Sequence, residues 1–105
     1  MTVSTSKSAY LDCYDLLDRA LDSPIGIRNR CANRGMANNL RTRLHYARAI
    51  SRRESLEIYA ADHPAHGTSP YDPLVIRIQQ DGKLWWIYIE PRAIQGEVEE
   101  LGAAE

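Results

Sequence analysis

The chain has 105 residues, of which 44% are hydrophobic and 26% charged, with a formal net charge of −1. This length and composition exclude a chain that is disordered as a whole and indicate one folded domain with a single core. No run of residues approaches the ~18 consecutive apolar positions that a membrane helix needs, so we expect a cytosolic, unprocessed protein. The two cysteines, Cys13 and Cys31, lack metal-binding spacing, and in a reducing compartment we expect them to be buried thiols.

The first predicted element is a helix that follows the polar N-terminus. Its apolar side chains recur at helical spacing at Tyr10, Tyr14, Leu17 and Leu21. Ser8 is the expected N-cap, and Pro24 ends the segment because the residue before a proline disfavours helical geometry. Four acidic residues lie on the other faces of this helix: Asp12, Asp15, Asp18 and Asp22.

Residues 25–28 are predicted to form either a short edge strand or an extended connector. A second helix then starts near Arg34 or Met36 and runs to Arg53. Its core side is predicted from the helical spacing of Met36, Ala37, Leu40, Leu44, Ala47 and Ile50.

Basic residues concentrate in residues 28–53, which hold eight of the thirteen Lys and Arg residues and no acidic residue. On one flank of the second helix, a basic stripe is predicted at Arg34, Arg41, His45, Arg48 and Arg52. Arginine suits bidentate contacts with phosphate or carboxylate, so the stripe could follow a nucleic-acid backbone or an acidic protein surface. Alternatively, the aspartates of the first helix pair with it as a solvated seam. The pI of about 6.3 makes the basicity local.

The C-terminal half is predicted to be mainly β. Residues 56–60 alternate between apolar and polar positions and are predicted to form a strand, and residues 61–73, with three prolines, a stiff loop. Residues 74–90 are predicted to be a hairpin that turns at Asp81-Gly82. This turn pairs Gln80 with Lys83, Ile78 with Trp85, Ile76 with Ile87, Leu74 with Ile89, Arg77 with Trp86 and Val75 with Tyr88.

Together these elements predict an α+β fold in which two helices pack on one face of a small antiparallel sheet. The sheet has three strands, or four if residues 25–28 add an edge strand. Residues 1–96 form the domain, and the acidic residues 97–105 are expected to be a flexible tail.

The outward face of this sheet is predicted to carry Tyr59, Arg77, Leu84, Trp86 and Tyr88. Trp86 opposite Arg77 would form a cation-π pair, and the rings offer a stacking platform for unpaired bases or an anchor for a protein. Alternatively, residues 61–73 or the segment after Pro91 fold over the face and bury it.

Nothing in the sequence indicates catalysis. The loop histidines His63 and His66 lie near Asp72, but His45 is the only other histidine, so we expect no metal site. The chain has no nucleophile-elbow or phosphate-loop motif, and Cys13 lies in an apolar helical stripe that is unsuited to a reactive thiolate. We therefore expect no enzyme activity, catalytic residue or cofactor.

The segment Ile25-Gly26-Ile27, followed by Leu40-Arg41-x-Arg43-Leu44-x-Tyr46-x-Arg48 and a short hairpin, resembles small proteins encoded by phages and prophages. The resemblance covers about half of the chain and implies a class of role without assigning residues. Such proteins commonly bind DNA, RNA or a host enzyme, and include inhibitors of CRISPR and restriction systems.

The sequence therefore predicts a non-enzymatic binding protein that docks on nucleic acid or a nucleoprotein complex through Arg34, Arg41, His45, Arg48 and Arg52. The alternative is a protein-protein inhibitor of a host protein, or a homodimer, that uses Tyr59, Arg77, Trp86 and Tyr88.

Overall fold

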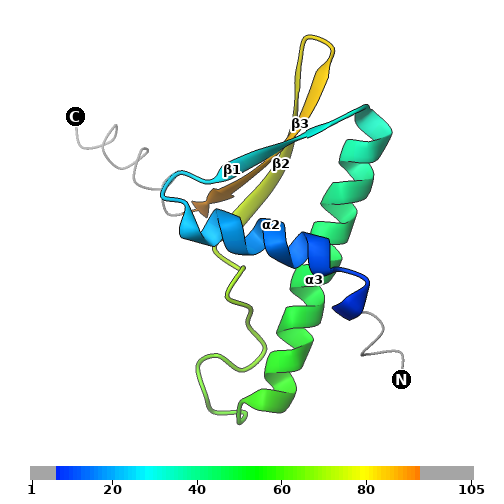
Figure 1. The fold of residues 1–105 in the computed structure, drawn as a ribbon. Helices are drawn as coiled ribbons and strands as arrows, with labels where there is room; N and C mark the ends of the chain where they lie inside the picture. The colour runs from blue at the N-terminus through cyan, green and yellow to red at the C-terminus, as the bar shows by residue number, and fades with distance from the viewer. Residues whose placement is uncertain (1–6, 93–105) are drawn as a thin grey trace, which may run out of the picture.

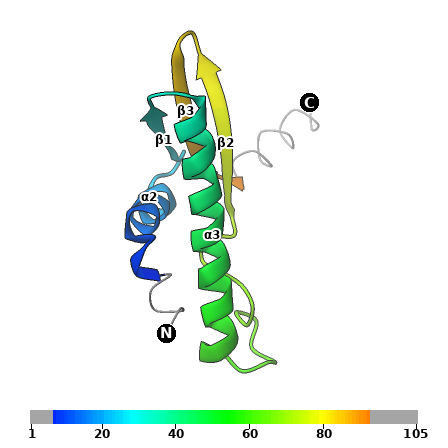
Figure 2. The same ribbon diagram turned by 90° about the vertical axis from the view of Figure 1, so that its right-hand side faces the viewer.

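The computed structural model describes residues 7–92, and its helices and antiparallel sheet confirm the α+β class. In chain order the elements are α2 (Leu11–Asp22), β1 (Ile27–Cys31), α3 (Arg34–Ile58), β2 (Leu74–Asp81) and β3 (Leu84–Pro91). Strand β3 lies between β1 and β2 and pairs antiparallel with both. Figure 1 shows α2 crossing in front of α3, and Figure 2 shows the sheet behind the upper part of α3. The tail predicted at residues 97–105 lies outside the described residues.

Helix α2 packs on the core through one side, as predicted, except that Leu21 of the predicted stripe is 40% exposed. Cys13, Leu17 and Ala20 are fully buried, and the Tyr14 hydroxyl donates a hydrogen bond of 2.8 Å to the Ala47 carbonyl oxygen of α3. The predicted N-cap at Ser8 is wrong. The N-cap residue is Tyr10, and no side chain caps the helix.

Strand β1 is an edge strand, which confirms the first of the two predictions for this segment, but it begins two residues later than predicted and extends to Cys31. The turn before it depends on Gly26, whose φ is +95°, a conformation that favours glycine. A Cβ atom there would lie only 2.5 Å from the carbonyl oxygen of Ile89. Gly26 therefore lets the chain pass close to β3 before β1 pairs with it.

Helix α3 begins at Arg34, as predicted, but continues to Ile58, so the strand predicted at residues 56–60 is wrong. The side chain of Asn33 caps its start by accepting a hydrogen bond of 2.8 Å from the Met36 amide. Neither Gly nor Pro occurs between Gly35 and Pro64, so nothing in the sequence stops the helix. Five alternating residues were too short a pattern to override this continuous run.

The β2–β3 hairpin forms, but its predicted register is wrong by two residues. Asp81 pairs with Leu84, Ile78 with Ile87 and Arg77 with Tyr88, so the turn residues are Gly82 and Lys83. A turn centred on Asp81-Gly82 would need positive φ at both residues, whereas only Gly82, at +63°, has it. This matches a type II′ turn, whose first central residue alone has positive φ.

Because a shift of two residues preserves the alternation of side chains, the predicted inner and outer sets of the hairpin are confirmed. The inner face contributes Cys31, Leu74, Ile87 and Ile89 to a core completed by both helices, and Trp85 packs against this core. The side chains of Trp86 and Tyr88 consequently belong to the opposite face of the sheet.

Candidate functional site

The structure divides the predicted basic stripe of α3 into exposed and engaged residues. Arg34 and Arg41, in the N-terminal half of the helix, are exposed and form no ion pair within residues 7–92. His45 is also largely exposed, and its Nδ1 atom lies 3.2 Å from Nη2 of Arg48. Arg48 and Arg52 instead contact the loop that leads to β2.

Arg48 is a buried structural residue, with only 7% of its surface exposed. Its Nη1 atom donates hydrogen bonds to the carbonyl oxygens of Leu74, at 2.7 Å, and Tyr71, at 3.1 Å. Burial, followed by the nearby charge of Arg52, lowers the pKa of Arg48, but a guanidinium remains charged at neutral pH. Arg48 thus fixes the start of β2 on α3.

Arg52 and Asp72 form an ion pair of 2.7 Å that holds the same loop. The second carboxylate oxygen of Asp72 accepts a hydrogen bond of 2.9 Å from the Ser69 amide. Burial opposes ionisation of Asp72, but this hydrogen bond and the contacts with Arg52 outweigh it and lower the pKa of Asp72. The charge of Arg52 is therefore already compensated within the fold.

The aspartates of α2 do not neutralise the basic stripe. Asp12 forms a bidentate ion pair with Arg43, at 2.7 and 2.9 Å, and Arg43 lies outside the stripe. The hydrogen bond from Arg43 lowers the pKa of Asp12. Asp15 pairs within its own helix with Arg19, and Asp18 accepts a hydrogen bond from the Tyr71 hydroxyl. The alternative of a seam between α2 and the stripe is thus wrong.

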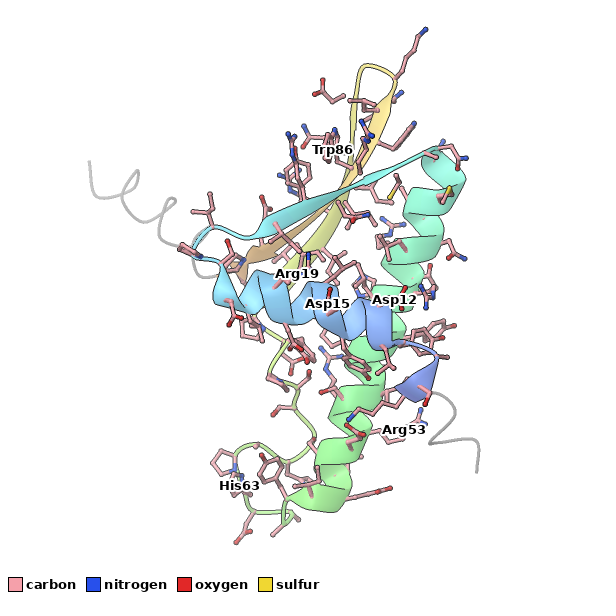
Figure 3. All side chains as sticks on the ribbon, viewed as in Figure 1. Asp12, Asp15, Arg19, Arg53, His63 and Trp86 are labelled. Atoms are coloured by element: carbon pink, nitrogen blue, oxygen red, sulfur yellow. The ribbon has the colours of Figure 1, made fainter. Side chains whose placement is uncertain are left out.

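A second basic surface, which we call the outer sheet face, lies on the side of the sheet opposite α2 and α3. It comprises Arg28, Arg30, Val75, Arg77, Gln79, Asp81, Leu84, Trp86, Tyr88 and Glu90. The loop at residues 61–73 does not cover it, because hydrogen bonds tie this loop to α2 and α3. The other predicted cover, the segment after Pro91, lies outside the described residues beyond Arg92. Figure 3 shows Trp86 on the upper part of the sheet and His63, in the loop, at the opposite end of the molecule.

Arginines from the flanking strands cover the rings of the central strand on this face. The guanidinium carbon of Arg28 lies 3.8 Å from the centroid of the Trp86 ring, and that of Arg77 lies 4.1 Å from the Tyr88 centroid. The predicted pairing of Arg77 with Trp86 is therefore wrong, because the two-residue register shift brings Arg77 opposite Tyr88. Arg28 also donates a hydrogen bond of 3.2 Å to the Tyr88 hydroxyl.

The two ring-covering arginines differ in how firmly they are held. Arg77 forms a bidentate ion pair with Glu90, at 3.0 and 3.2 Å. Arg28 has no carboxylate within ion-pair distance in the described part of the chain, and the same holds for the exposed Arg30. The positive charges of Arg28 and Arg30 are therefore available to an anionic partner.

Tyr59, which was predicted on this face, lies elsewhere. It is the C-cap residue of α3, and its ring stacks on His63 with centroids 4.5 Å apart. His66 contacts the Tyr59 carbonyl oxygen at 2.9 Å through Nδ1. The loop histidines are thus engaged in local contacts, and no group of three potential metal ligands occurs among residues 7–92.

A cleft of about 620 Å³ lies between α2, the C-terminal half of α3 and the loop. Its lining divides evenly between aromatic or aliphatic residues, among them Tyr14, Ile58 and Tyr59, and polar or charged residues, among them Asp18 and Glu54. Nearby, burial raises the pKa of the Cys13 thiol to about 11, which disfavours the reactive thiolate. The cleft therefore offers apolar contact area beside the carboxylates of Asp18 and Glu54.

Arg28 and Arg30 of the candidate site were not predicted from the sequence. The basic block was assigned to a helix flank, although residues 27–31 alternate as Ile-Arg-Asn-Arg-Cys. That alternation places both arginines on one side of a strand, and a strand assignment for these five residues would have found them.

No protein-family model, curated protein or solved structure matches the chain. None of the helices in residues 7–92 is long and apolar enough to cross a membrane.

Proposed function

We propose that this protein binds nucleic acid through the outer sheet face. The observation that carries the proposal is the combination of arginines and aromatic rings on a sheet face that α2, α3 and the loop leave uncovered. Arginine recognises phosphate with strong, charge-assisted hydrogen bonds, and aromatic rings stack on bases of any sequence.

The charges at this surface favour a polyanionic partner despite the net charge of −1. Arg28 and Arg30 lack carboxylate partners within the described residues, and Arg34, the first residue of α3, lies three residues after the end of β1. Figure 1 shows β1 leading into the upper end of α3, where the helix begins. A phosphate backbone that crosses β1 could therefore contact all three arginines, and Arg41 lies about two turns further along α3.

Binding to labelled oligonucleotides, measured by fluorescence anisotropy over a range of salt concentrations, tests the proposal. We expect Arg30→Glu to weaken binding strongly and to reduce the steepness of the salt dependence by about 0.7 to 0.9 in log K per log [salt] for the lost phosphate contact. The matched control is Arg53→Glu, which makes the same charge change at an exposed residue near the opposite end of α3. We expect the control to retain most of the affinity.

Equal effects of the two substitutions would contradict the outer sheet face as the binding surface. Absence of binding at about 50 mM salt, where phosphate contacts are strong, would contradict nucleic-acid binding itself. A protein partner or a second copy of the chain on the same face would instead give a complex that tolerates high salt.

A further inference from the structure

The contacts of Trp86 indicate what kind of nucleic acid the outer sheet face would take. The guanidinium of Arg28 covers one face of the indole ring, with 3.8 Å between the guanidinium carbon and the ring centroid. A base that stacked on Trp86 would need this same position. Arg28 is exposed, and within residues 7–92 no carboxylate lies within ion-pair distance of it. An incoming ligand must therefore replace only its contact with the ring and its exposed hydrogen bond of 3.2 Å to the Tyr88 hydroxyl.

The indole nitrogen of Trp86 is the second observation. Nε1 is buried, yet it has no hydrogen-bond acceptor within the part of the chain that the structure describes. A buried donor without an acceptor is unfavourable, and native proteins rarely leave one unpaired. Across the sheet its neighbours on this face are Arg30 and Gln79. Movement of the side chains around the indole would let Nε1 donate to an oxygen atom of a ligand.

Tyr88 lies two residues along the same strand, about 6.8 Å away, and is less able to accept a base. Arg77 covers its ring at 4.1 Å, and the bidentate ion pair with Glu90 holds Arg77 there. The arginine over Trp86 can therefore be displaced by a ligand, whereas the arginine over Tyr88 is held in place.

We infer that the outer sheet face binds single-stranded nucleic acid, with an unpaired base stacked on Trp86 in place of Arg28. This inference rests on the proposed nucleic-acid binding and names its substrate class. The displaced guanidinium of Arg28 contacts a phosphate, and Nε1 of Trp86 donates to an oxygen of the bound strand. A duplex offers phosphates to the same arginines, but its bases are stacked inside the helix and cannot reach the ring.

The test compares a labelled oligothymidine with a duplex of the same length, at matched salt, for wild type and three variants. We expect wild type to bind the single strand more tightly. Trp86→Leu should weaken single-strand binding about 5- to 150-fold, the equivalent of the roughly 1–3 kcal/mol measured per stacked base, and should leave duplex binding unchanged. Trp86→Phe keeps an aromatic ring and should retain most of the affinity. Tyr46→Leu is the control, because Tyr46 is an exposed ring of α3 outside the outer sheet face, and it should bind like wild type.

The possible outcomes separate the inference from the proposed function. One outcome is that single strand and duplex bind with equal affinity, that Trp86→Leu does not change this affinity, and that Arg30→Glu lowers it. This outcome would overturn the inference of base stacking but leave the proposed phosphate binding intact. Absence of binding to both would overturn both proposals.

A second measurement covers the case in which Trp86→Leu does not fold. In Trp85→Phe, which removes the inner-face indole, Trp86 is the only tryptophan. Oligothymidine should quench its fluorescence and duplex should not. Emission that does not change while the strand binds would equally overturn the inference.

Discussion

Replacement of Arg48 by methionine tests whether this arginine belongs to the fold or to the binding surface. Methionine keeps the aliphatic length of the side chain but removes the guanidinium. It removes the donor to the buried Leu74 carbonyl oxygen, whereas the Tyr71 carbonyl oxygen keeps its hydrogen bond of 3.0 Å from the Leu74 amide.

The structure sets the expected size of this effect. A buried acceptor left without a partner costs about 1–3 kcal/mol, and water can reach the partly buried Tyr71 carbonyl more easily than that of Leu74. Removal of a buried cation also restores part of its desolvation cost. We therefore expect the free energy of unfolding to fall by about 2 kcal/mol, and Tm by roughly 8–16 °C for a domain of this size.

Urea unfolding followed by circular dichroism, together with thermal melts, measures both quantities. The matched control is Arg41→Met, because Arg41 is an exposed residue of the same helix and its loss should change stability by less than about 0.5 kcal/mol. If Arg48→Met were as stable as the control, or lost nucleic-acid binding while remaining folded, the structural role assigned to Arg48 would be refuted.

Two further predictions concern the β1 turn and the pH dependence of stability. Gly26→Ala should destabilise the fold by more than about 2 kcal/mol in urea unfolding, because it adds a backbone clash with Ile89 to the cost of positive φ. The added Cβ of Gly82→Ala meets no atom within 4 Å, so this substitution should show only the backbone cost of about 1–2 kcal/mol. Similar costs for the two substitutions would contradict the close approach at Gly26. Burial, followed by the charge of Arg48, lowers the pKa of His45, so the folded state binds this proton less readily than the unfolded state. The stability due to neutral His45 is complete above about pH 6.5 and is lost as pH falls through the lowered pKa of His45. Tm measured against pH should show this loss, and the loss should be smaller in His45→Gln. The same pH profile of Tm in wild type and His45→Gln would contradict the role assigned to His45.

The sequence predicted the two faces of the hairpin because they depend only on alternation. The register error of two residues at Gly82 left every side chain of β2 and β3 on its predicted face. The turn type itself depended on which residue adopts positive φ, and Asp81-Gly82 and Gly82-Lys83 are both compatible with the local sequence.

The roles of Arg48 and Arg52 could not be predicted, because their partners lie in a loop about twenty residues further along the chain. Helical spacing placed both residues on one flank, but the carbonyl of Leu74 and the carboxylate of Asp72 reach that flank only through the tertiary fold. Local patterns determine which side of a helix a residue occupies, and they do not determine what packs against that side. The number of arginines without an internal partner is therefore smaller on α3 than the sequence predicted, and β1 adds Arg28 and Arg30, which were not predicted.

The central claim is that the outer sheet face, and not the C-terminal half of α3, contacts nucleic acid. Backbone amide NMR shifts recorded while oligothymidine is added test this claim most directly. The account predicts that the largest shift changes occur at Arg28, Arg30, Trp86 and Tyr88, with little change at Arg52. Changes concentrated at Arg52 and the cleft beside Tyr71, with the outer sheet face unaffected, would contradict it.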